Sequence, residues 1–261
     1  MKDPWMSDIK LYGYATSPYV RKVGAFLYYK QLPFEHVPVS PISPQETIAF
    51  TGGTQVPVLK IGEEWRLDSS PIGFWLDELY PERPLLPADP ALKQKILEID
   101  DWISETFLLS IFRGAIDAPD NLAFRNAGWR LAALLSAHTP LPEKIRHEWP
   151  NLLRKAPFIK AMAPRMNLEE PYAEMQARIG MELIGHLGEG PFLGGSPEPT
   201  MADMAVYPQL LFYYMAGLQE DLQAAKIPVL RDWIGRVAPY LPENPTLVHD
   251  DFIIKTLSDL D

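Results

Sequence analysis

A proline-rich segment at residues 81–90 divides this chain into two parts with different patterns of apolar residues. The segment reads PERPLLPADP, and its four prolines interrupt helices and strands because proline has no backbone N–H to donate. Before it, short strand-like apolar runs alternate with helical segments, whereas the long periodic segments after it have helical spacing. We therefore expect an α/β domain over residues 1–80, a linker over 81–90 and an all-helical domain over 91–261.

The first part contains seven expected elements in the order strand, helix, strand, short helix, strand, strand, helix. Their ranges are 9–14, 19–31, 34–39, a short helix opened by Ser43 and ended by Gly52-Gly53, 56–61, 65–67 and 71–80. Ser43 and Glu46 have the spacing of a capping box, and Gly62-Glu63 is typical of a tight hairpin turn. This order predicts a thioredoxin-like layout, in which helices cover both faces of a mixed sheet.

The first expected helix has a clear start and one apolar face. Ser17 has the residue type of an N-cap, and Pro18 that of the first helical position. One face at helical spacing carries Val20, Val23 and Leu27. The basic residues of this helix fall outside that face: Arg21, Lys22 and Lys30.

The stretch from Thr54 to Ile72 combines features that suit a small peptide ligand. Pro57 interrupts a strand, where proline belongs only at an edge or in a special turn that can contain a cis bond. Asp68-Ser69-Ser70-Pro71 then opens a helix, with proline at its expected first position. Two hydroxyls and a carboxylate beside an interrupted strand favour peptide binding. The alternative is that Asp68 and Ser69 only cap the helix.

After the linker the pattern is helical throughout. The expected long helices cover residues 91–112, 172–187, 201–215 and 228–237. Thr200 and Asp203 form a variant of the capping box before the third of them. Between residues 114 and 170 we expect several short helices with breaks at Pro119, Pro140, Pro142, Pro150, Pro157 and Pro164.

Composition excludes several classes of function. The net charge of −10 and the pI near 5.0 argue against nucleic acid as a partner. The chain has no cysteine, which excludes disulfides, thiolate metal sites and a cysteine nucleophile, and its five histidines lack metal-ligand spacing, so we expect no metal. We expect a cytoplasmic protein without a membrane span, since Met1-Lys2-Asp3-Pro4-Trp5 lacks an apolar signal core and no apolar run reaches about 18 residues.

Four motifs in this order resemble the cytosolic glutathione S-transferase family over nearly the whole chain. They are Ser17-Pro18-Tyr19-Val20, Val56-Pro57-Val58-Leu59, Asp68-Ser69-Ser70-Pro71-Ile72, and Phe192–Ser196 with Pro199-Thr200 and Asp203. They look like the family's active-site helix start, cis-proline segment, glutathione motif and helical-domain capping signature. The residues around Pro57 and Asp68 are most similar to zeta-like classes, whereas Ala15–Pro18 does not match those classes, so the class stays open.

The resemblance implies that the chain binds glutathione. In the family, the tripeptide pairs with the strand end beside the cis-proline, and its γ-glutamyl end lies at the start of the next helix. Here that implies binding by Gln55, Val56, Pro57, Asp68 and Ser69. Ser69 would offer its hydroxyl and N–H to the carboxylate of the ligand, and Asp68 would pair with the ammonium.

Activation of the glutathione thiol falls to Ser17 in this interpretation. A hydroxyl at a helix N-terminus favours the thiolate over the thiol. Neighbouring Tyr12, Tyr14 and Thr16 are rival donors, and the absence of cysteine argues against the thiol-transferase branches of the family. For the second-substrate pocket we name Tyr14 and Trp102. The other aromatic candidates are more often core residues: Phe107, Phe112, Trp129 and Tyr172.

The resemblance therefore predicts a serine- or tyrosine-type glutathione transferase whose bound thiolate attacks a small, largely apolar electrophile, as in detoxification. A homodimer is expected because the family usually forms one. Two alternatives stay open: a non-catalytic binding or scaffold protein with the same fold, and a glutathione-dependent isomerase or lyase.

Overall fold

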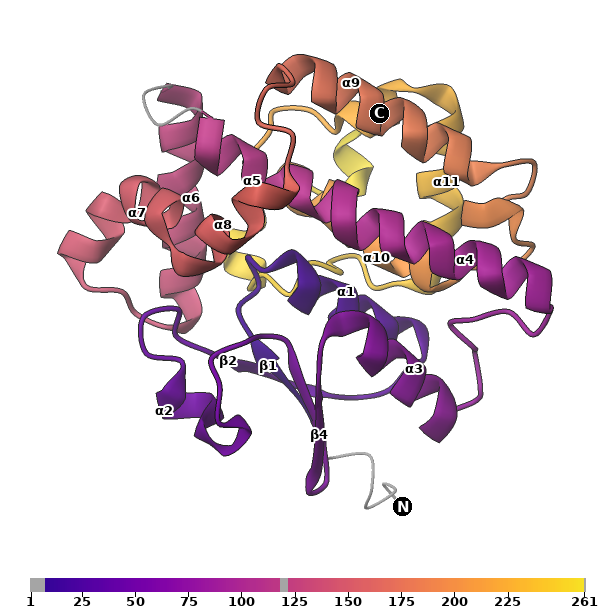
Figure 1. The fold of residues 1–261 in the computed structure, drawn as a ribbon, viewed down its shortest axis with the longest axis horizontal. Coiled ribbons are helices and arrows are strands. Elements are labelled where there is room, and N and C mark those ends of the chain that lie inside the picture. Colours follow the sequence, from indigo (N-terminus) through magenta and orange to yellow (C-terminus); the bar gives the residue numbers. More distant parts are fainter. Residues whose placement is uncertain (1–7, 118–121, 261) are drawn as a thin grey trace.

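The computed structural model describes residues 8–117 and 122–260 and shows a small sheet beneath a larger layer of helices (Figure 1). The sheet has the strand order β2-β1-β3-β4, in which β1 runs parallel to β2 and antiparallel to β3, and β3 runs antiparallel to β4. The strands are β1 (Ile9–Gly13), β2 (Glu35–Pro38), β3 (Val58–Ile61) and β4 (Glu64–Leu67). The thioredoxin-like layout is thus confirmed.

Three helices belong to the first part of the described chain, and the helices from α4 onwards belong to the second part. They are α1 (Pro18–Tyr29), α2 (Gln45–Ile48), α3 (Ser69–Leu79), α4 (Pro90–Trp102), α5 (Leu108–Asp117), α6 (Leu122–His138), α7 (Glu143–Lys155), α8 (Pro157–Met162), α9 (Tyr172–Leu187), α10 (Met201–Met215) and α11 (Pro228–Val237). Short 3₁₀ turns cover Ala49–Thr51, Ala163–Arg165, Leu193–Gly195, Gln223–Lys226, Ala238–Tyr240, Asp250–Phe252 and Leu257–Leu260. The sheet part ends with α3, and the helical part begins with α4.

Successive residues of β3 pack on opposite faces of the sheet. Leu59 belongs to the large core that includes α1 and the helical part, whereas the adjacent Val58 packs with Ile48 of α2 on the opposite face. The large core is continuous from Ile9 in β1 to Val248 near the chain end, so the two parts share one apolar interior. In Figure 1, α1 and α3 lie between the sheet and the helices of the second part.

Helix α1 has two buried sides, which corrects the expectation from its apolar face. Arg21 and Lys22 are completely buried and Lys30 is buried as well, although all three fall outside the apolar stripe. The reason is that α1 packs both against the sheet and against α10 of the helical part. A charged side chain tolerates this position only when partners replace its water.

Two expected helix starts were wrong. Helix α2 begins after Pro44 and has no side-chain cap, so Ser43 and Glu46 do not form a capping box; the backbone carbonyl of Ser43 accepts the Glu46 N–H instead, at 3.2 Å. Helix α3 begins at Ser69, two residues before Pro71. Proline is equally compatible with later positions of the first turn, where backbone N–H groups have no intrahelical partner anyway.

The long helix expected from residue 91 continues further than predicted and contains a π turn. Helix α4 passes through π-helical residues Ile103–Phe107 directly into α5. Pro150 does not break its segment but lies inside α7, where Gly128 of α6 approaches its ring: a Cβ on Gly128 would lie 2.9 Å from the proline Cγ. Packing between the two helices thus accommodates a residue that local propensity would exclude. The expected break at Pro119 lies outside the described residues.

Helix α10 is the central helix of the second part, and Asp203 fixes its start. The capping box between Thr200 and Asp203 is confirmed, with the Thr200 N–H donating to the carboxylate at 2.8 Å. The same carboxylate accepts from the Leu193 N–H at 3.0 Å and from the Trp233 indole N–H at 2.8 Å. Burial raises the pKa of Asp203, and these donors oppose the shift. Asp203 therefore joins the turn before α10, α10 itself and α11.

Three histidines from distant segments meet edge to face at β2. The ring of His36 lies 5.8 Å from that of His138 at the end of α6, which lies 6.2 Å from that of His249. His36 Nε2 lies 3.1 Å from the Gly13 carbonyl and donates to it. Burial, aided by His138, lowers the pKa of His36 from 6.5 to about 4, and burial also lowers the pKa of His138.

These shifts predict a loss of stability in mild acid. Below pH 6.5 the histidines of the unfolded chain bind protons, whereas in the folded protein the buried His36 stays neutral until the pH approaches 4. The free energy of unfolding therefore falls as the pH drops from 6.5 towards 4. The slope is at most about 1.4 kcal/mol per pH unit for each such proton. Urea unfolding between pH 7 and 5 measures it. His36→Gln should flatten the slope, and His147→Gln, at a side chain that is 76% exposed, should leave it unchanged; equal slopes in all three proteins would contradict the prediction.

Candidate functional site

The strand register brings three separate loops to one end of the sheet. Tyr12 of β1 pairs with Val58 of β3, and Val58 pairs with Leu67 of β4. Consequently the loop after β1, the loop before β3 and the loop after β4 all leave the sheet at the same end. These loops hold the candidate site residues Ser17, Gln55, Val56, Pro57, Asp68 and Ser69.

Ser17 is the N-cap of α1, as predicted. Its Oγ accepts the Val20 N–H at 3.4 Å, and its own backbone N–H donates to the Tyr14 carbonyl at 2.9 Å. The residue is only 6% exposed. The cap uses the hydroxyl oxygen as an acceptor, and no described residue accepts the hydroxyl proton. That proton and the positive end of α1 are thus both available to an anion at this position.

The Val56-Pro57 peptide bond is cis. This is the second of the two settings that the sequence left open for Pro57, a sheet edge or a special turn with a cis bond. Strand β3 begins only at Val58. The backbone N–H and C=O of Val56 therefore lie outside the strand ladder, at the same sheet end as Ser17. An extended peptide can use such groups as it would use the edge of a strand.

Asp68 and Gln55 are in direct contact. The Gln55 side-chain amide donates to the Asp68 carboxylate, and both side chains are exposed. Asp68 has a φ of +64°, in the left-handed region, and although it occupies the N-cap position of α3 its side chain makes no capping bond. The capping interpretation of Asp68 is therefore wrong. Its carboxylate faces solvent beside the first helical residue, Ser69, which is buried.

Beneath these loops, a buried ion pair joins three helices. Lys22 of α1 lies 2.6 Å from Asp100 of α4, and both side chains are almost completely buried. Ser70 of α3 accepts from the Lys22 ammonium at 2.9 Å and donates to the other Asp100 oxygen at 2.5 Å. Burial lowers the pKa of Lys22, and Asp100 opposes the shift. The cluster joins the start of α3, where Ser69 lies, to α1 of the first part and to α4 of the helical part.

Arg21 ties the Ser17 loop to α10. Its Nη1 donates to the Ala15 carbonyl at 2.6 Å, its Nε donates to Gln209 Oε1 at 2.9 Å, and its guanidinium stacks on Phe212 at 3.7 Å. Gln209 in turn donates to the Pro18 carbonyl at 2.9 Å. Burial lowers the pKa of Arg21 to about 9. Arg21 thus holds the loop before Ser17, at Ala15, and Gln209 of α10 holds it after Ser17, at Pro18. The two side chains are joined by their own hydrogen bond.

The two residues named for a second-substrate pocket lie in different places. Tyr14 packs against an apolar cluster of α6 and α7 that contains Leu135 and Trp149, and burial raises its pKa. Trp102 faces α9 instead: its indole donates to Glu182 at 2.7 Å, and its ring lies 4.4 Å from that of His186. Its ring also lies 5.9 Å from that of Phe107 in the π-helical turn, so its polar contact is with α9.

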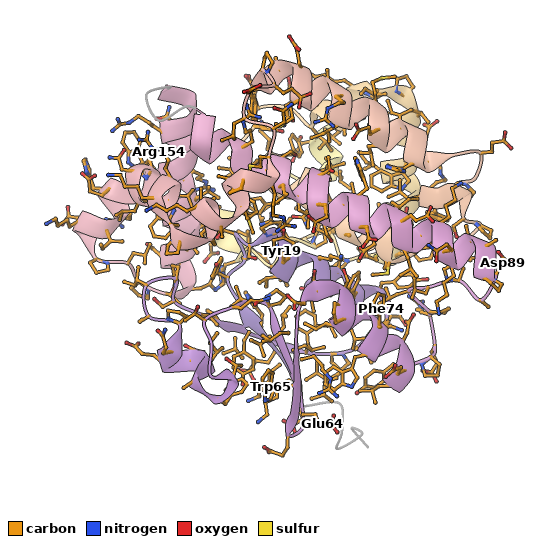
Figure 2. All side chains as sticks on the ribbon, viewed as in Figure 1. Tyr19, Glu64, Trp65, Phe74, Asp89 and Arg154 are labelled. Carbon is orange, nitrogen blue, oxygen red and sulfur yellow. The ribbon has the colours of Figure 1, made fainter. Side chains whose placement is uncertain are left out.

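Sequence reasoning missed a polar group next to the Ser17 loop. Tyr19, at the start of α1, is half-buried, and burial raises its pKa, with Arg165 lowering it and Glu105 raising it. Arg165 and Glu105 form an ion pair between the turn after α8 and the π-helical turn. Figure 2 shows Tyr19 near the centre of the molecule, where the helical part meets α1. The position of Tyr19 two residues after Ser17 was the one available signal.

Neither a metal centre nor a membrane span emerges within residues 8–117 and 122–260. No cluster of three or more histidine, aspartate or glutamate side chains in these ranges has the arrangement of a metal site. No helix in them combines the length and the apolar character needed to cross a bilayer.

Comparison with known proteins assigns both parts of the chain. The family model for the glutathione S-transferase N-terminal domain matches residues 11–84, and the model for the C-terminal domain matches residues 171–236. Together the two models cover more than half of the chain.

Two characterised proteins are similar in sequence. A glutathione S-transferase of the zeta class from Euphorbia esula is 36% identical over 93 residues, which make up 34% of this chain and 41% of that protein. This match therefore spans less than half of the relative. A prostaglandin E synthase 2 from Danio rerio is 40% identical over 270 residues, covering 88% of this chain and 71% of that protein.

The fold is shared with solved structures. A glutathione S-transferase from Rhodospirillum rubrum F11 superposes with a TM-score of 0.61 at 19% identity, over 97% of this chain and 98% of that one. The family models account for both the sheet part and the helical part, and the superposition runs through both. The chain therefore belongs to the glutathione S-transferase family.

Proposed function

We propose that this protein binds glutathione at the sheet end that carries Ser17, Val56-Pro57 and Asp68-Ser69. The observation that carries the proposal is the register of β1, β3 and β4, which brings a helix start, a free strand-like backbone and an exposed carboxylate to one place. Glutathione needs these three features because it has a thiol, a central peptide and a charged γ-glutamyl end. Two of the three similar proteins named above are glutathione transferases, which supports the same ligand.

Each end of the ligand has a matching group. The γ-glutamyl carboxylate accepts from the hydroxyl and N–H of Ser69 at the positive end of α3, and the ammonium pairs with Asp68, which Gln55 orients. The central peptide of glutathione pairs with the backbone of Val56. The thiol then lies towards Ser17 and the start of α1.

In the proposed reaction Ser17 stabilises the thiolate. The glutathione S–H proton passes to solvent, and the Ser17 hydroxyl donates a hydrogen bond to the resulting sulfur anion. The sulfur electron pair attacks an electrophilic carbon and forms a C–S bond. A leaving group departs with its bonding electrons or, in an addition, the adjacent carbon takes a proton from solvent. The second substrate is a small, largely apolar electrophile.

Calorimetry with reduced glutathione tests the binding site. Wild-type protein should bind at sub-millimolar to millimolar concentration, and Asp68→Asn should weaken binding about two- to fivefold, because an exposed ion pair contributes roughly 0.2–1 kcal/mol. Glu63→Gln is the matched control, since it removes an exposed carboxylate at the opposite end of the β3–β4 hairpin. No heat of binding for wild-type protein would refute the proposed function, and equal effects of both substitutions would refute the role of Asp68.

A glutathione-dependent isomerase or lyase is the second candidate. The similarity to a prostaglandin E synthase favours it, because that name denotes a different reaction on a protein similar over most of this chain. A panel of aryl halides, unsaturated ketones, thioethers and peroxides, each tested with glutathione, separates the reaction classes. Binding of glutathione without turnover of any of them would favour a scaffold protein.

Quaternary structure and location stay part of the proposal. We propose a homodimer, as is usual for the family, and a cytoplasmic location in keeping with the cysteine-free, acidic sequence. Sedimentation equilibrium decides the first, because a monomer has a mass of 29.6 kDa. Fractionation of cells that produce the protein decides the second.

A further inference from the structure

Arg21 of α1 carries its positive charge inside the protein without a negative partner. The residue is completely buried, and its side chain donates to the Ala15 carbonyl at 2.6 Å and to Gln209 Oε1 at 2.9 Å. Its Nη2 is buried and has no hydrogen-bond partner among residues 8–117 and 122–260. Both acceptors are neutral, whereas a buried charge is ordinarily paired with an opposite one. Arg21 therefore lacks the counter-charge that would offset the cost of its burial.

The other two buried cations of α1 do have counter-charges. Lys22 lies 2.6 Å from Asp100, and Lys30 lies 2.6 Å from Asp77. All three cations belong to one helix and avoid solvent to a similar degree. The absence of a carboxylate at Arg21 is thus a property of this one position, next to the candidate site, and not of α1 as a whole.

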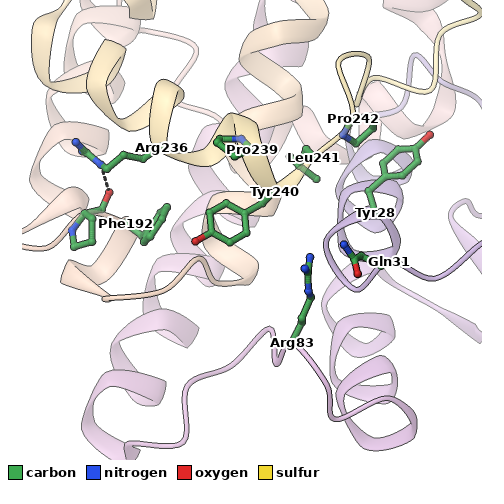
Figure 3. Close-up of a pocket in the computed structure, with 10 residues that line it drawn as sticks. Tyr28, Gln31, Arg83, Phe192, Arg236, Pro239, Tyr240, Leu241 and Pro242 are labelled. Carbon is green, nitrogen blue, oxygen red and sulfur yellow. Dashed lines mark hydrogen bonds between the residues drawn. The ribbon is translucent and has the colours of Figure 1, made fainter.

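Solvent does not offset the charge of Arg21 either. Arg236 of α11 also has a backbone acceptor, the Pro191 carbonyl at 2.8 Å, but it is partly exposed at a cavity of about 610 Å³, where water reaches the guanidinium (Figure 3). Arg21 is enclosed instead, with its guanidinium 3.7 Å from the centre of the Phe212 ring. Burial lowers the pKa of Arg21 to about 9, so the group stays charged at pH 7. Of the described residues, Tyr213 of α10 is the titratable neighbour that acts on it, and burial raises the pKa of Tyr213, which keeps that phenol neutral.

The guanidinium lies beneath the loop that opens α1. It holds the carbonyl of Ala15, two residues before Ser17, and the Arg21 backbone N–H donates to the Ser17 carbonyl at 3.1 Å. Two peptide units span at most about 8 Å, so the charge lies within roughly 10 Å of the Ser17 cap. This is where the proposed reaction forms a sulfur anion. The positive end of α1 acts on the same place.

We propose that the uncompensated charge of Arg21 holds the sulfur of bound glutathione as the thiolate, from beneath the Ser17 loop. This role rests on the proposed function. Arg21 does not touch the ligand: the Ser17 hydroxyl donates the hydrogen bond, and Arg21 acts through its electric field. A unit charge at roughly 10 Å shifts a pKa by about one unit when the effective dielectric constant is about 20. The thiolate in turn supplies the negative charge that the buried guanidinium lacks.

The pKa of the bound glutathione thiol tests this role, followed by thiolate absorbance near 240 nm at saturating glutathione. Arg21→Gln removes the charge and keeps an amide that can donate to the Ala15 carbonyl, so the thiol pKa should rise by about one unit. The pH profile of kcat/KM for conjugation should move to higher pH by the same amount and reach the wild-type plateau within about twofold. A residue that only supported the loop would lower the plateau and leave the thiol pKa unchanged.

Arg130→Gln is the matched control. Arg130 is a partly buried arginine of α6 that also donates to neutral backbone acceptors, the carbonyls of Ala216 at 2.8 Å and Phe252 at 2.7 Å. These acceptors lie after the end of α10 and near the chain end, and not in the Ser17 loop. The substitution changes the net charge as Arg21→Gln does, and it should alter the thiol pKa by less than about 0.2 unit.

Two variants of Gln209 separate the charge of Arg21 from the tether to α10. Gln209→Glu and Gln209→Met both lose the amide that donates to the Pro18 carbonyl at 2.9 Å. Only Gln209→Glu places a carboxylate beside the guanidinium, in the position of the present Oε1. It should raise the thiol pKa by about one unit, whereas Gln209→Met should leave it within about 0.3 unit. Both variants retain Arg21, so they decide the question even if Arg21→Gln fails to fold.

Three outcomes would overturn the role of Arg21 alone. Equal shifts in Arg21→Gln and Arg130→Gln would assign the effect to net charge. Equal shifts in the two Gln209 variants would assign it to the tether, and an unchanged thiol pKa with a lowered plateau would leave Arg21 as a support of the loop. Calorimetry of the wild-type protein with glutathione comes first: absence of binding would refute the proposed function and the role of Arg21 together, so the two failures are distinguishable.

Discussion

Replacing Ser17 by alanine should lower kcat/KM for glutathione conjugation about 10- to 100-fold. A hydrogen bond to a charged group contributes roughly 1.5–3 kcal/mol, and the alanine variant loses the one that the hydroxyl donates to the thiolate. The same loss should raise the pKa of the bound glutathione thiol by about 1–2 units. Absorbance of the thiolate near 240 nm, followed against pH in the glutathione complex, measures this shift directly.

Two further variants separate chemistry from folding. Ser17 also caps α1, so alanine should cost about 0.5–2 kcal/mol of stability, which urea unfolding reveals. Ser17→Thr keeps both the cap and the hydroxyl and should retain most of the activity. Tyr14→Phe should have little effect, because Tyr14 packs into the α6–α7 cluster. An unchanged thiol pKa in Ser17→Ala, together with a raised one in Tyr14→Phe, would transfer the role to Tyr14.

Replacing Asp100 by alanine should destabilise the protein by about 3–5 kcal/mol. The substitution leaves the Lys22 ammonium buried without its counter-ion, and an uncompensated charge in the interior is costly. Ser70 loses its acceptor at the same time. Denaturant unfolding at pH 7 measures the loss, and because α1, α3 and α4 all meet here, a single cooperative transition should shift as a whole.

The double variant Lys22→Met with Asp100→Leu is the control. It removes both charges and fills the space with apolar side chains, so it should recover most of the stability lost in Asp100→Ala. A double variant that is as unstable as the single one would show that the ion pair itself, and not the orphaned charge, carries the stabilisation. Glu98→Ala, at an exposed position on the same helix, should have little effect.

The order of elements and the candidate binding loops could be predicted because their signals are local. Ser17 before Pro18, and Thr200 before Asp203, are short motifs whose hydrogen bonds stay within one turn, and both caps are present. The sequence left two settings open for Pro57, a sheet edge or a special turn that can contain a cis bond, and the structure has the cis bond. The assignment of Gln55, Val56, Asp68 and Ser69 to glutathione stays a prediction, for which the shared sheet end provides the geometry.

Local signals also produced the errors. Ser43 and Glu46 have the spacing of a capping box, yet no side-chain bond caps α2. Trp102 was named for the second-substrate pocket, and that assignment stays a prediction; local signals gave no hint that its indole donates to Glu182, which is 80 residues away in the chain. Pro150 has every local reason to end a helix, yet it lies inside α7, where Gly128 of α6 approaches its ring closely.

By itself, the sequence determined the thioredoxin-like order of elements and the residue types that converge on one end of the sheet, whereas the division at residues 81–90 stays a prediction. Only the tertiary structure decided that the charged residues of α1 are buried, and with which partners. Lys22 pairs with Asp100, 78 residues away, and Arg21 with Gln209, 188 residues away. Apolar periodicity shows which face of a helix avoids water, but it cannot show whether a distant segment will bring the partner that makes a buried charge tolerable.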